Sequence, residues 1–315
     1  MTDMTKKPKL LVICGPTAAG KTAVAVETAK LLDGVIISAD SMQIYKELSI
    51  GTAKPTPEEL DGVDCRLIDF IEPDGEYNVF RFKSDAEREI DDVVSSGRTP
   101  ILCGGTGLYI DVLASNTALS DGSSDEAVRA ELKKQAEEVG SAELHRQLSE
   151  VDKPSAERIH PNDTKRVIRA LEIYRVTGKP QSVWDAGSVR EERYSICRIL
   201  INCSDRAKLY ERIDRRVDAM ISAGLLDEAK RVFEKYDPEK ISAIGYPELF
   251  AYFRGESTLD EAVAKIKQYS RNYAKRQLTW FRRGEYEGEF FTDERGAEEI
   301  AADIARIFAG FGRDK

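Results

Sequence analysis

The chain has 315 residues, which is enough for one large domain or two smaller ones, each with a packed core. Hydrophobic residues make up 41% and charged residues 33%, a composition typical of soluble globular proteins rather than of disordered or membrane proteins. The formal charge of −9 argues against a protein that coats nucleic acid nonspecifically, but it is compatible with a local basic surface.

The cysteines and histidines exclude one kind of site and predict a compartment. The cysteines are scattered without a C-x-x-C pair, and with two histidines they do not make the ligand set of a structural zinc site. Together with the lack of an apolar run of about 20 residues, they predict a cytoplasmic protein with reduced thiols and no membrane partner. The five cysteines are Cys14, Cys65, Cys103, Cys197 and Cys203.

The first predicted elements are a buried strand, a glycine-rich loop and a helix. Residues 9–14 form an apolar run, and residues 23–34 have helical periodicity that ends at Gly34. The loop between them matches the P-loop motif G-x-x-x-x-G-K-[ST]. In this motif backbone N–H groups converge on phosphate oxygens, the lysine neutralises charge and the last hydroxyl is placed for Mg²⁺. We predict that it binds a diphosphate or triphosphate; its residues are Gly15, Pro16, Thr17, Ala18, Ala19, Gly20, Lys21 and Thr22.

Three further short apolar runs predict strands. They span residues 35–40, 99–107 and 197–203, and a helix-like stretch from Phe80 to Ser96 precedes the second of them. Strands of this type that alternate with helices indicate an α/β fold. We predict a parallel sheet with right-handed crossovers, like the core of the P-loop NTPases.

A charged, helical stretch interrupts this pattern between the third and fourth strands. From about Ser120 to Thr177 no strand-like run occurs, which predicts an all-helical insertion in the α/β core. More helices follow the fourth strand, and the tail from Gly296 is predicted to be a final amphipathic helix. The predicted division is a first part of the core at 1–118, a helical insertion domain at 119–198, and a third part at 199–315 that completes the core and adds helices.

An acidic residue, Asp40, closes the second predicted strand. Because ligands of parallel sheets bind at the carboxyl ends of the strands, Asp40 is expected beside the P-loop. The sequence alone leaves three roles open for it: a Mg²⁺ ligand, a general base, or the N-cap of a following helix. Ser41 and Gln43 follow within reach of whatever approaches Asp40.

The third predicted strand lacks the terminal carboxylate that P-loop ATPases commonly use for the metal. It ends instead in Gly104 and Gly105, followed by Thr106. Glycines at this place allow either the close approach of a ligand or a tight turn. The usual machinery of ATP hydrolysis is therefore not visible.

A basic stripe between Lys265 and Arg283 contains no acidic residue, and aromatic residues are interleaved with its cations. In an acidic protein this pattern favours contact with nucleic acid or polyphosphate, because rings can stack on bases. The alternative is a solvated helix whose rings face the core. The cations of the stripe are Lys265, Lys267, Arg271, Lys275, Arg276, Arg282 and Arg283.

Two smaller basic clusters lie elsewhere in the chain. Lys165, Arg166 and Arg169 fall within about one helical turn of one another. The second cluster comprises Arg212, Arg215 and Arg216, and it leaves two alternatives open: a bidentate clamp on a diphosphate, or pairing with the neighbouring Asp214 and Asp218.

Long blocks in a fixed order resemble the tRNA dimethylallyltransferases, also called tRNA isopentenyltransferases, of the bacterial type. The resemblance runs from Leu11 to Arg283 and is far more specific than a P-loop alone. The blocks are GPTAAGKT (15–22), ISADSMQIYKELSIGTAKPT (37–56), GGTGLY (104–109), IHPNDTKRVIRALE (159–172), ERIDRRVDAMISAGLLDEA (211–229), AIGYPEL (243–249) and YAKRQLTWFRR (273–283).

The resemblance implies an enzyme that transfers the dimethylallyl group of dimethylallyl diphosphate to N6 of adenosine 37, in the anticodon arm of tRNA, and releases diphosphate. It also implies Mg²⁺ as the cofactor and no requirement for ATP. The helical insertion is then expected to bind tRNA. We expect the protein to act as a monomer.

The resemblance also implies residue roles. Asp40 matches the general base, Thr17 matches the threonine beside the bridging oxygen of the leaving diphosphate, and Arg216 matches a diphosphate contact; these three are the expected catalytic residues. Lys21 and Thr22 match contacts to the diphosphate and the metal, with Thr22 as the metal ligand. From the resemblance and the basic stripe, the residues expected to contact tRNA are Asp40, Ser41, Met42, Gln43, Thr106, Arg129, Lys165, Arg166, Val167, Ile168, Arg169, Lys275 and Arg282.

The sequence departs from the family pattern in two places. Before Leu67-Ile68-Asp69 the family often has Pro-His-His or Pro-His-Arg, whereas this chain has Asp64-Cys65-Arg66, so no role of those histidines carries over. The zinc-finger extension of eukaryotic members is also absent from the sequence, as expected for a bacterial-type enzyme.

Three other functions account for part of the sequence. A P-loop small-molecule kinase would share the α/β core but leave the basic stripe and the third strand unexplained. An isopentenyltransferase that acts on free adenine nucleotides would use the same donor, but the helical insertion and the basic stripe favour an RNA substrate. A non-catalytic RNA-binding module would leave Asp40 and the P-loop without a purpose.

Overall fold

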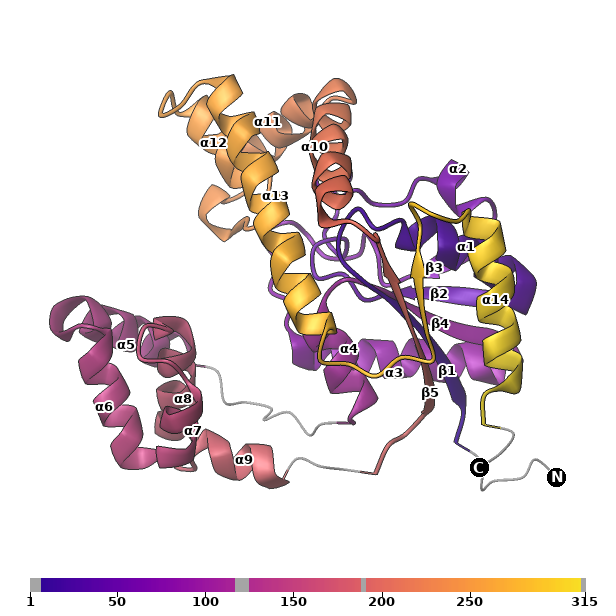
Figure 1. Ribbon diagram of the computed structural model, residues 1–315. Coiled ribbons are helices and arrows are strands. Elements are labelled where there is room, and N and C mark those ends of the chain that lie inside the picture. The colour runs from indigo at the N-terminus through magenta and orange to yellow at the C-terminus, as the bar shows by residue number, and fades with distance from the viewer. Residues whose placement is uncertain (1–6, 117–124, 188–190, 313–315) are drawn as a thin grey trace. The chain divides into compact units, whose positions relative to one another are not determined.

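The computed structural model describes residues 7–116, 125–187 and 191–312 and divides the chain into two units (Figure 1). Unit 1 comprises Met1–Ala114 and Arg193–Lys315, and unit 2 comprises Ser115–Glu192. Within the described ranges, no helix has the length and apolar character needed to cross a membrane.

A six-stranded parallel sheet forms the centre of unit 1. Its strand order is β3-β2-β4-β1-β5-β6, so strands that neighbour each other in space are far apart in the sequence. The predicted α/β fold with a parallel sheet is thereby confirmed, and two edge strands, β3 and β6, are added to it. The strands are β1 (Lys9–Cys14), β2 (Gly34–Ser38), β3 (Cys65–Arg66), β4 (Thr99–Gly104), β5 (Ser195–Asn202) and β6 (Gly288–Phe291).

The predicted domain boundaries need one correction. The boundary at 118 lies outside the described residues, but the boundary at 198 cuts through β5. Ser195 at the start of β5 already pairs with Lys9 of β1, so the chain has returned to the sheet by that residue. The second part of unit 1 therefore begins at Arg193.

Helices cover both faces of the sheet and one end of it (Figure 1). The helices of unit 1 are α1 (Lys21–Leu32), α2 (Pro57–Leu60), α3 (Val79–Ser95), α4 (Gly107–Ala114), α10 (Arg206–Ser222), α11 (Leu225–Lys235), the 3-10 turn η1 (Pro238–Lys240), α12 (Tyr246–Phe253), α13 (Leu259–Phe281) and α14 (Ala297–Gly310). The last of these is the amphipathic helix expected in the tail.

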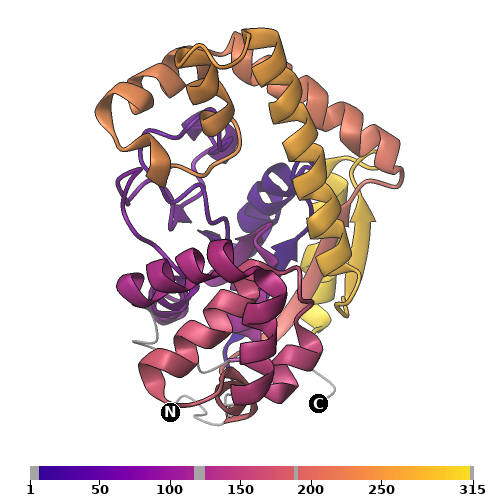
Figure 2. The ribbon, with the colours of Figure 1, turned by 90° about the vertical axis from the view of Figure 1, so that its left-hand side faces the viewer.

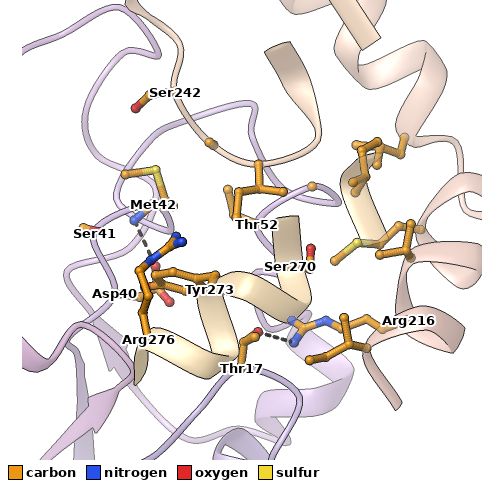
Figure 3. Close-up of a pocket in the computed structure, with 18 residues that line it drawn as sticks. Thr17, Asp40, Ser41, Met42, Thr52, Arg216, Ser242, Ser270, Tyr273 and Arg276 are labelled. Atoms are coloured by element: carbon orange, nitrogen blue, oxygen red, sulfur yellow. Dashed lines mark hydrogen bonds between the residues drawn. The ribbon is translucent and has the colours of Figure 1, made fainter. Parts of the chain in front are cut away.

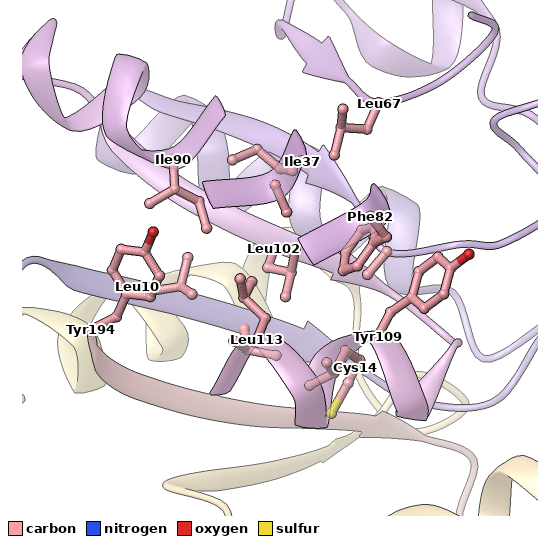
Figure 4. Packing of buried hydrophobic residues seen from close by; sticks show 14 of the residues in the cluster. Leu10, Cys14, Ile37, Leu67, Phe82, Ile90, Leu102, Tyr109, Leu113 and Tyr194 are labelled. Atoms are coloured by element: carbon pink, nitrogen blue, oxygen red, sulfur yellow. The ribbon is translucent and has the colours of Figure 1, made fainter. Parts of the chain in front are cut away.

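Alternation along the central strand explains how the two faces are filled. Successive side chains of a strand point to opposite faces, so Leu11 and Ile13 of β1 pack with α1 and α14. Leu10 and Val12 face the other way and pack with α3 and α4, in the cluster shown in Figure 4. Both faces are thus sealed from water, and the carboxyl ends of the strands are left to form a site.

The helices α10, α11, α12 and α13 gather at the carboxyl ends of the strands, and the long α13 runs from that group toward the sheet (Figures 1 and 2). The start of α13 is fixed by a capping box, in which Thr258 and Glu261 exchange side-chain and backbone hydrogen bonds. These helices share a core around Leu225, Tyr246 and Phe250.

Unit 2 is a helical unit with a hydrophobic core of its own. Its described residues contain no strand. Leu132, Leu144, Leu148 and Val167 are fully buried in its core. The helices are α5 (Glu126–Val139), α6 (Ser141–Val151), α7 (Lys153–Arg158), α8 (Thr164–Thr177) and α9 (Gln181–Gly187).

Candidate active site

The glycine-rich loop connects the end of β1 to the start of α1, as the motif predicts. Gly15 has a φ of +151°, and a Cβ built on it would lie 1.9 Å from the carbonyl oxygen of Ile201, so no other residue fits there. Gly20, at φ +82°, turns the chain into α1. The Lys21 Nζ donates to the carbonyl of Pro16 at 2.8 Å, which folds this side chain back over the loop.

Asp40 lies at the carboxyl end of β2, beside the P-loop. Its Oδ1 accepts a hydrogen bond from the backbone N–H of Met42 at 2.9 Å. The residues that follow form turns rather than a helix, and α2 begins only at Pro57. The N-cap alternative for Asp40 is therefore wrong, and the base and metal-ligand alternatives remain.

A cavity of about 250 Å³ lies in front of the P-loop and Asp40 (Figure 3). Its polar wall includes Thr17, Asp40 and Ser41, together with Arg216 of α10 and Arg276 of α13. Its apolar lining includes Ile213, Val217, Met220, Leu225, Ala243, Ile244 and Ile266. The cavity therefore presents both charged groups and a hydrocarbon surface to a ligand.

Two cations near Asp40 are in surroundings that disfavour their charge. Burial lowers the pKa of Lys21, an effect that Arg216 reinforces and Asp40 opposes. Burial likewise lowers the pKa of Arg216, against the effect of Asp40. An anion close to either cation would favour its charged form and so offset the effect of burial.

Tyr273 of α13 faces the same cavity, beside Asp40 and Arg276 in Figure 3. Burial raises the pKa of Tyr273 to about 12, and the charge of Asp40 acts in the same direction. The phenol is therefore protonated at neutral pH, and Thr106 and Gln277 lie within its hydrogen-bonding reach.

The three arginines of α10 have different environments. Arg216 lines the cavity, and its Nη1 donates to Thr17 Oγ1 at 3.3 Å. Arg212 donates to the hydroxyl of Thr292 at 2.7 Å and to its carbonyl at 3.1 Å, and Thr292 in turn donates to the carbonyl of Ala19 at 2.8 Å. Arg212 thus supports the P-loop from behind, while Arg215 is exposed. Arg216 is the member of the cluster that can reach a diphosphate.

The loop after Asp40 is held by a carboxylate that the sequence did not single out. Glu228 of α11 is 4% exposed, and its oxygens accept hydrogen bonds from the backbone N–H groups of residues 49, 50 and 51 at 2.9–3.1 Å. The hydroxyl of Tyr246 donates to the same carboxylate at 2.6 Å. Because Gly51 and Thr52 line the cavity, Glu228 determines the position of one of its walls.

The other predicted residues of the loops lie in a common network. Thr106 Oγ1 accepts from the N–H of Ser41 at 3.0 Å, which joins the end of β4 to the segment that carries Asp40. Gln43 accepts from the hydroxyl of Ser38 at 3.3 Å and donates to the carbonyl of Ala53 at 3.0 Å.

The glycines at the end of β4 are explained by packing within the protein. A Cβ on Gly104 would lie 2.2 Å from the carbonyl oxygen of Ala39, and one on Gly105 would lie 2.4 Å from Nε2 of Gln277. Both alternatives drawn from the sequence are thus replaced by a third, the close approach of neighbouring segments of the chain.

The basic stripe on α13 is partly neutralised by α10. Lys267 pairs with Asp218 at 2.6 Å, and Arg271 pairs with Asp214. These contacts also correct the alternative in which both aspartates pair with the arginines of their own helix. Phe281 is buried in the core, and Trp280 donates from its Nε1 to Asp111 at 2.8 Å.

The remaining cations of the stripe are exposed on the surface. The guanidinium of Arg276 lies 5.6 Å from the ring centroid of Tyr273. The cations of the stripe without an ion pair to any carboxylate in residues 7–116, 125–187 and 191–312 are Lys265, Lys275, Arg276, Arg282 and Arg283. These five of the seven cations of the stripe are free to contact an anionic partner.

In unit 2, two arginines that were predicted to contact tRNA form ion pairs with a buried glutamate. The side chain of Glu172 is fully buried. It forms ion pairs with Arg129 at 3.0 Å and with Arg169 at 2.9 Å. Removing either arginine would leave a buried charge partly uncompensated, so both have a structural role in unit 2.

The side chains of Val167 and Ile168 are 0% and 7% exposed in the core of unit 2, so they support α8 and do not face a partner. This corrects the expectation of tRNA contacts at those two side chains. Lys165 and Arg166 are exposed, and Arg166 lies 3.4 Å from Asp163. The exposed part of the predicted patch is therefore its first two residues.

The segment that departs from the family pattern has a structural explanation. Arg66 of β3 forms ion pairs with Asp64 at 3.1 Å, Glu89 at 3.1 Å and Asp92 at 2.6 Å, which tie the edge strand to α3. Cys65 beside it packs against the core.

The hydroxyl of Thr22, beside the P-loop, is the side chain expected to bind Mg²⁺. No group of three or more metal-ligating side chains occurs in the described part of the chain. Thr22 is exposed in the first turn of α1, beside the loop that would hold a phosphate. Mg²⁺ usually takes one or two protein ligands and completes its shell with phosphate oxygens and water, so this hydroxyl together with a bound diphosphate fits the ion.

A P-loop at the end of β1, a carboxylate at the end of β2 and a cavity lined by both charged and apolar side chains define the class: this is a P-loop α/β protein with a cavity beside its phosphate-binding motif. The family model for IPP transferase matches residues 43–284. A tRNA dimethylallyltransferase of Geobacillus thermodenitrificans is 47% identical over 302 residues, covering 95% of this chain and 95% of that protein. The tRNA dimethylallyltransferase of Acetivibrio thermocellus is 48% identical over 312 residues, covering 96% and 98%.

Solved structures give the same result. The full-length tRNA isopentenylpyrophosphate transferase of Bacillus halodurans superimposes with a TM-score of 0.70 at 42% identity, covering 96% of each chain. A eukaryotic dimethylallyltransferase acting on tRNA has a TM-score of 0.75 at 29% identity, covering 87% of this chain and 70% of that one. This chain belongs to the IPP transferase family, the family of the tRNA dimethylallyltransferases.

Proposed function

We propose that this protein transfers the dimethylallyl group of dimethylallyl diphosphate to N6 of adenosine 37 of a tRNA and releases diphosphate. The observation that carries the proposal is that one cavity joins Thr17 of the P-loop, the carboxylate of Asp40 and an apolar wall. A cavity of about 250 Å³ is smaller than the roughly 300–1,000 Å³ of pockets that enclose drug-sized ligands. This favours a short prenyl diphosphate over a nucleoside triphosphate.

The leaving group is the first chemical requirement. An allylic diphosphate ionises once the charge of the departing diphosphate is stabilised, and preorganised cations and N–H groups are an effective means of doing so. Lys21 and Arg216 supply the cations, and the N–H groups at the start of α1 supply dipoles. The hydroxyl of Thr17 accepts a hydrogen bond from Arg216, and in this proposal it contacts the bridging oxygen of the diphosphate. Mg²⁺ held by Thr22 and the diphosphate would stabilise the same negative charge.

The acceptor requires a base. As the N6–C1 bond forms and the C1–O bond breaks, N6 acquires a positive charge and must lose a proton. Asp40 lies beside the P-loop with one oxygen fixed by Met42, and it accepts that proton. The adenine has to leave the anticodon stack to reach this cavity, which costs a few kcal/mol that stacking and polar contacts offset.

Exposed cations of α13 and α8 support an RNA acceptor rather than a free nucleotide. Lys275 and Arg282 on α13, and Lys165 on α8, are exposed. Contacts from such cations to phosphates provide affinity for a long polyanion that a mononucleotide would not exploit. We further propose that the enzyme works in the cytoplasm as a monomer with Mg²⁺, which sedimentation of the purified protein and titration with a chelator would test.

The experiment is a transfer assay with the purified protein, Mg²⁺, dimethylallyl diphosphate and unmodified tRNA, followed by mass analysis of the nucleosides. We expect adenosine to gain one dimethylallyl group in the tRNA. Parallel reactions contain ATP in place of the prenyl donor, or AMP in place of tRNA. Hydrolysis of ATP, or prenylation of AMP at a rate equal to that of tRNA, would favour the kinase or the free-nucleotide enzyme instead.

A further inference from the structure

Gln277 is a buried amide of α13 that the sequence pattern did not distinguish from its basic and aromatic neighbours. Its side chain is 6% exposed, although the residues on either side of it along the helix, Arg276 and Leu278, belong to less buried parts of the surface. A buried amide is costly unless both its donor and its acceptor are satisfied. The hydrogen-bond partners of its amide, Thr17 and Gly105, therefore explain why a polar residue occupies this buried position.

Both halves of the amide contact loops at the carboxyl ends of strands. The Oε1 accepts from the backbone N–H of Thr17 at 2.8 Å, and the Nε2 donates to the carbonyl oxygen of Gly105 at 2.9 Å. The opposite orientation of the amide would place a donor against a donor and an acceptor against an acceptor, so the partners fix the orientation. One side chain thus joins the P-loop to the end of β4.

Thr17 is consequently held at two points. Gln277 holds its backbone N–H, and Arg216 holds its hydroxyl at 3.3 Å. The N–H of Thr17 is not available to a phosphate, whereas its hydroxyl faces the cavity. The orientation of that hydroxyl therefore depends on Gln277, which is itself anchored to the sheet through Gly105.

Gly105 is adapted to this contact. A Cβ at this position would lie 2.4 Å from Nε2 of Gln277, so only glycine allows the amide to approach the β4 carbonyl. Gly105 and Gln277, which are remote in the sequence, thus join α13 to the end of β4.

We propose that Gln277 is a positioning residue for the leaving group: it anchors the P-loop at Thr17 so that the threonine hydroxyl is directed at the diphosphate. This inference rests on the proposed function for its kinetic consequences, but not for its effect on diphosphate binding. Gln277 touches neither substrate itself.

The first test is Gln277→Met, which keeps the volume and removes both hydrogen bonds. We expect kcat for prenyl transfer to fall about 10–100-fold, the loss produced when reacting groups are displaced by up to about 1 Å, with the KM for tRNA nearly unchanged. The matched control is Thr28→Val, which removes a buried hydrogen bond of α1 to the carbonyl of Val24 without touching either loop. It should lower the melting temperature while kcat stays at the wild-type value. Equal losses of kcat in both variants would overturn the proposal.

A double-mutant cycle separates positioning from general packing. Thr17→Val removes the hydroxyl and keeps the N–H that Gln277 holds. If Gln277 acts through that hydroxyl, the double variant should be within about threefold of Thr17→Val alone, since residues that act as a unit are not additive. Multiplication of the two separate losses would contradict the assignment.

Calorimetry with inorganic diphosphate and Mg²⁺ keeps the inference independent of the proposed function. If the wild-type protein transfers no prenyl group, that function fails, yet the comparison of diphosphate affinities still tests Gln277. We expect Gln277→Met to bind diphosphate at least about fivefold more weakly, because its loop has lost a support. An unchanged affinity for diphosphate would refute the proposal that Gln277 supports the P-loop. Should the methionine variant not fold, Gln277→Glu serves instead, because it retains the acceptor for Thr17 and places an oxygen against the Gly105 carbonyl.

Discussion

At the scale of single residues, the carboxylate of Asp40 is oriented by a hydrogen bond and still lines the cavity. Its Oδ1 accepts from the Met42 N–H, and the neighbouring Ser41 is fixed to Thr106. The carboxylate therefore keeps a defined direction while it still lines the cavity. A base placed in this way needs no movement before it accepts a proton.

Replacing Asp40 by asparagine keeps the size and the acceptor for Met42 but removes the base. We expect single-turnover prenyl transfer to fall by roughly 10²–10⁴-fold, the usual contribution of a positioned base. Diphosphate affinity and melting temperature should change little. Asp69→Asn, at an exposed carboxylate with a positive φ that asparagine tolerates, is the control, and a rate equal to that of the control would exclude Asp40 as the base.

The cysteines provide a pH-dependent prediction. Burial raises the pKa of Cys103 to about 11 and the pKa of Cys14 and Cys65 to about 12. The thiolate is the reactive form, so alkylation of the folded protein at pH 8 should be at least about 100-fold slower than in urea. Rapid labelling of any of the three in the folded state would contradict this.

The same shifts affect stability at high pH. A thiol of the unfolded chain ionises near pH 8.5, whereas the folded thiols remain protonated until about pH 11–12. Their contribution is complete below the unfolded value and is lost as pH rises toward the folded one. Urea denaturation at pH 8 and pH 10 should show lower stability at the higher pH.

The P-loop residues could be predicted because their motif is local. The contacts between residues far apart in the chain could not be predicted from the sequence. The motif fixed the positions of Lys21 and Thr22 because its geometry is local. Gln277 and Glu228 reach their partners from 260 and about 178 positions away. No period or motif marks such a contact, since a buried amide within a basic segment has the sequence pattern of a surface helix.

At the scale of elements, long buried strands were predicted and short edge strands were not. β1 and β5 are apolar runs because both faces of a parallel sheet are covered. β3 has two residues and β6 has four, and both are half-exposed, so their composition carries little signal. They form because the open edges of β2 and β5 offer unpaired backbone groups.

Helix α13 yields a prediction with an internal control. Lys275 and Arg282 are exposed and lie seven residues apart, about two helical turns, so they share a face. If both contact tRNA phosphates, Lys275→Ala together with Arg282→Ala should weaken tRNA binding and lower the slope of log K against log[salt] by about 1–2, given roughly 0.7–0.9 per phosphate neutralised.

The control for that pair is Lys267→Ala with Arg271→Ala, on the same helix. These cations are already paired with Asp218 and Asp214, so they should contribute less to the salt slope. Diphosphate affinity should persist in both double variants. If salt titrations of tRNA binding give the same slope for the exposed pair and for wild type, the stripe is a solvated helix face.

At the scale of the whole molecule, the core of unit 2 is built from residues of unit 2. Leu148 of α6 is fully buried in that core. Leu148→Ala should therefore destabilise unit 2 by about 2–5 kcal/mol, the usual range for leucine-to-alanine changes in a core. Calorimetric unfolding should show an earlier transition for this unit, and tRNA affinity should fall at temperatures above it. At these temperatures the affinity for diphosphate should be preserved. If the affinities for tRNA and for diphosphate fell together, the two units would not unfold separately.

The order of strands in the sheet has a consequence for synthesis on the ribosome. Lys9 of β1 pairs with Ser195 of β5, which follows it by 186 positions. At about 5–20 residues per second, some 10–40 s separate the emergence of these two strands. β4 emerges about halfway through that interval, since Leu11 of β1 pairs with Ile101 of β4, 90 positions later. From then until β5 emerges, β1 has one sheet neighbour and its other edge is open. A nascent chain of this protein is therefore expected to engage chaperones until β5 emerges, and translation that pauses within unit 2 would lengthen the period in which the half-built sheet can aggregate.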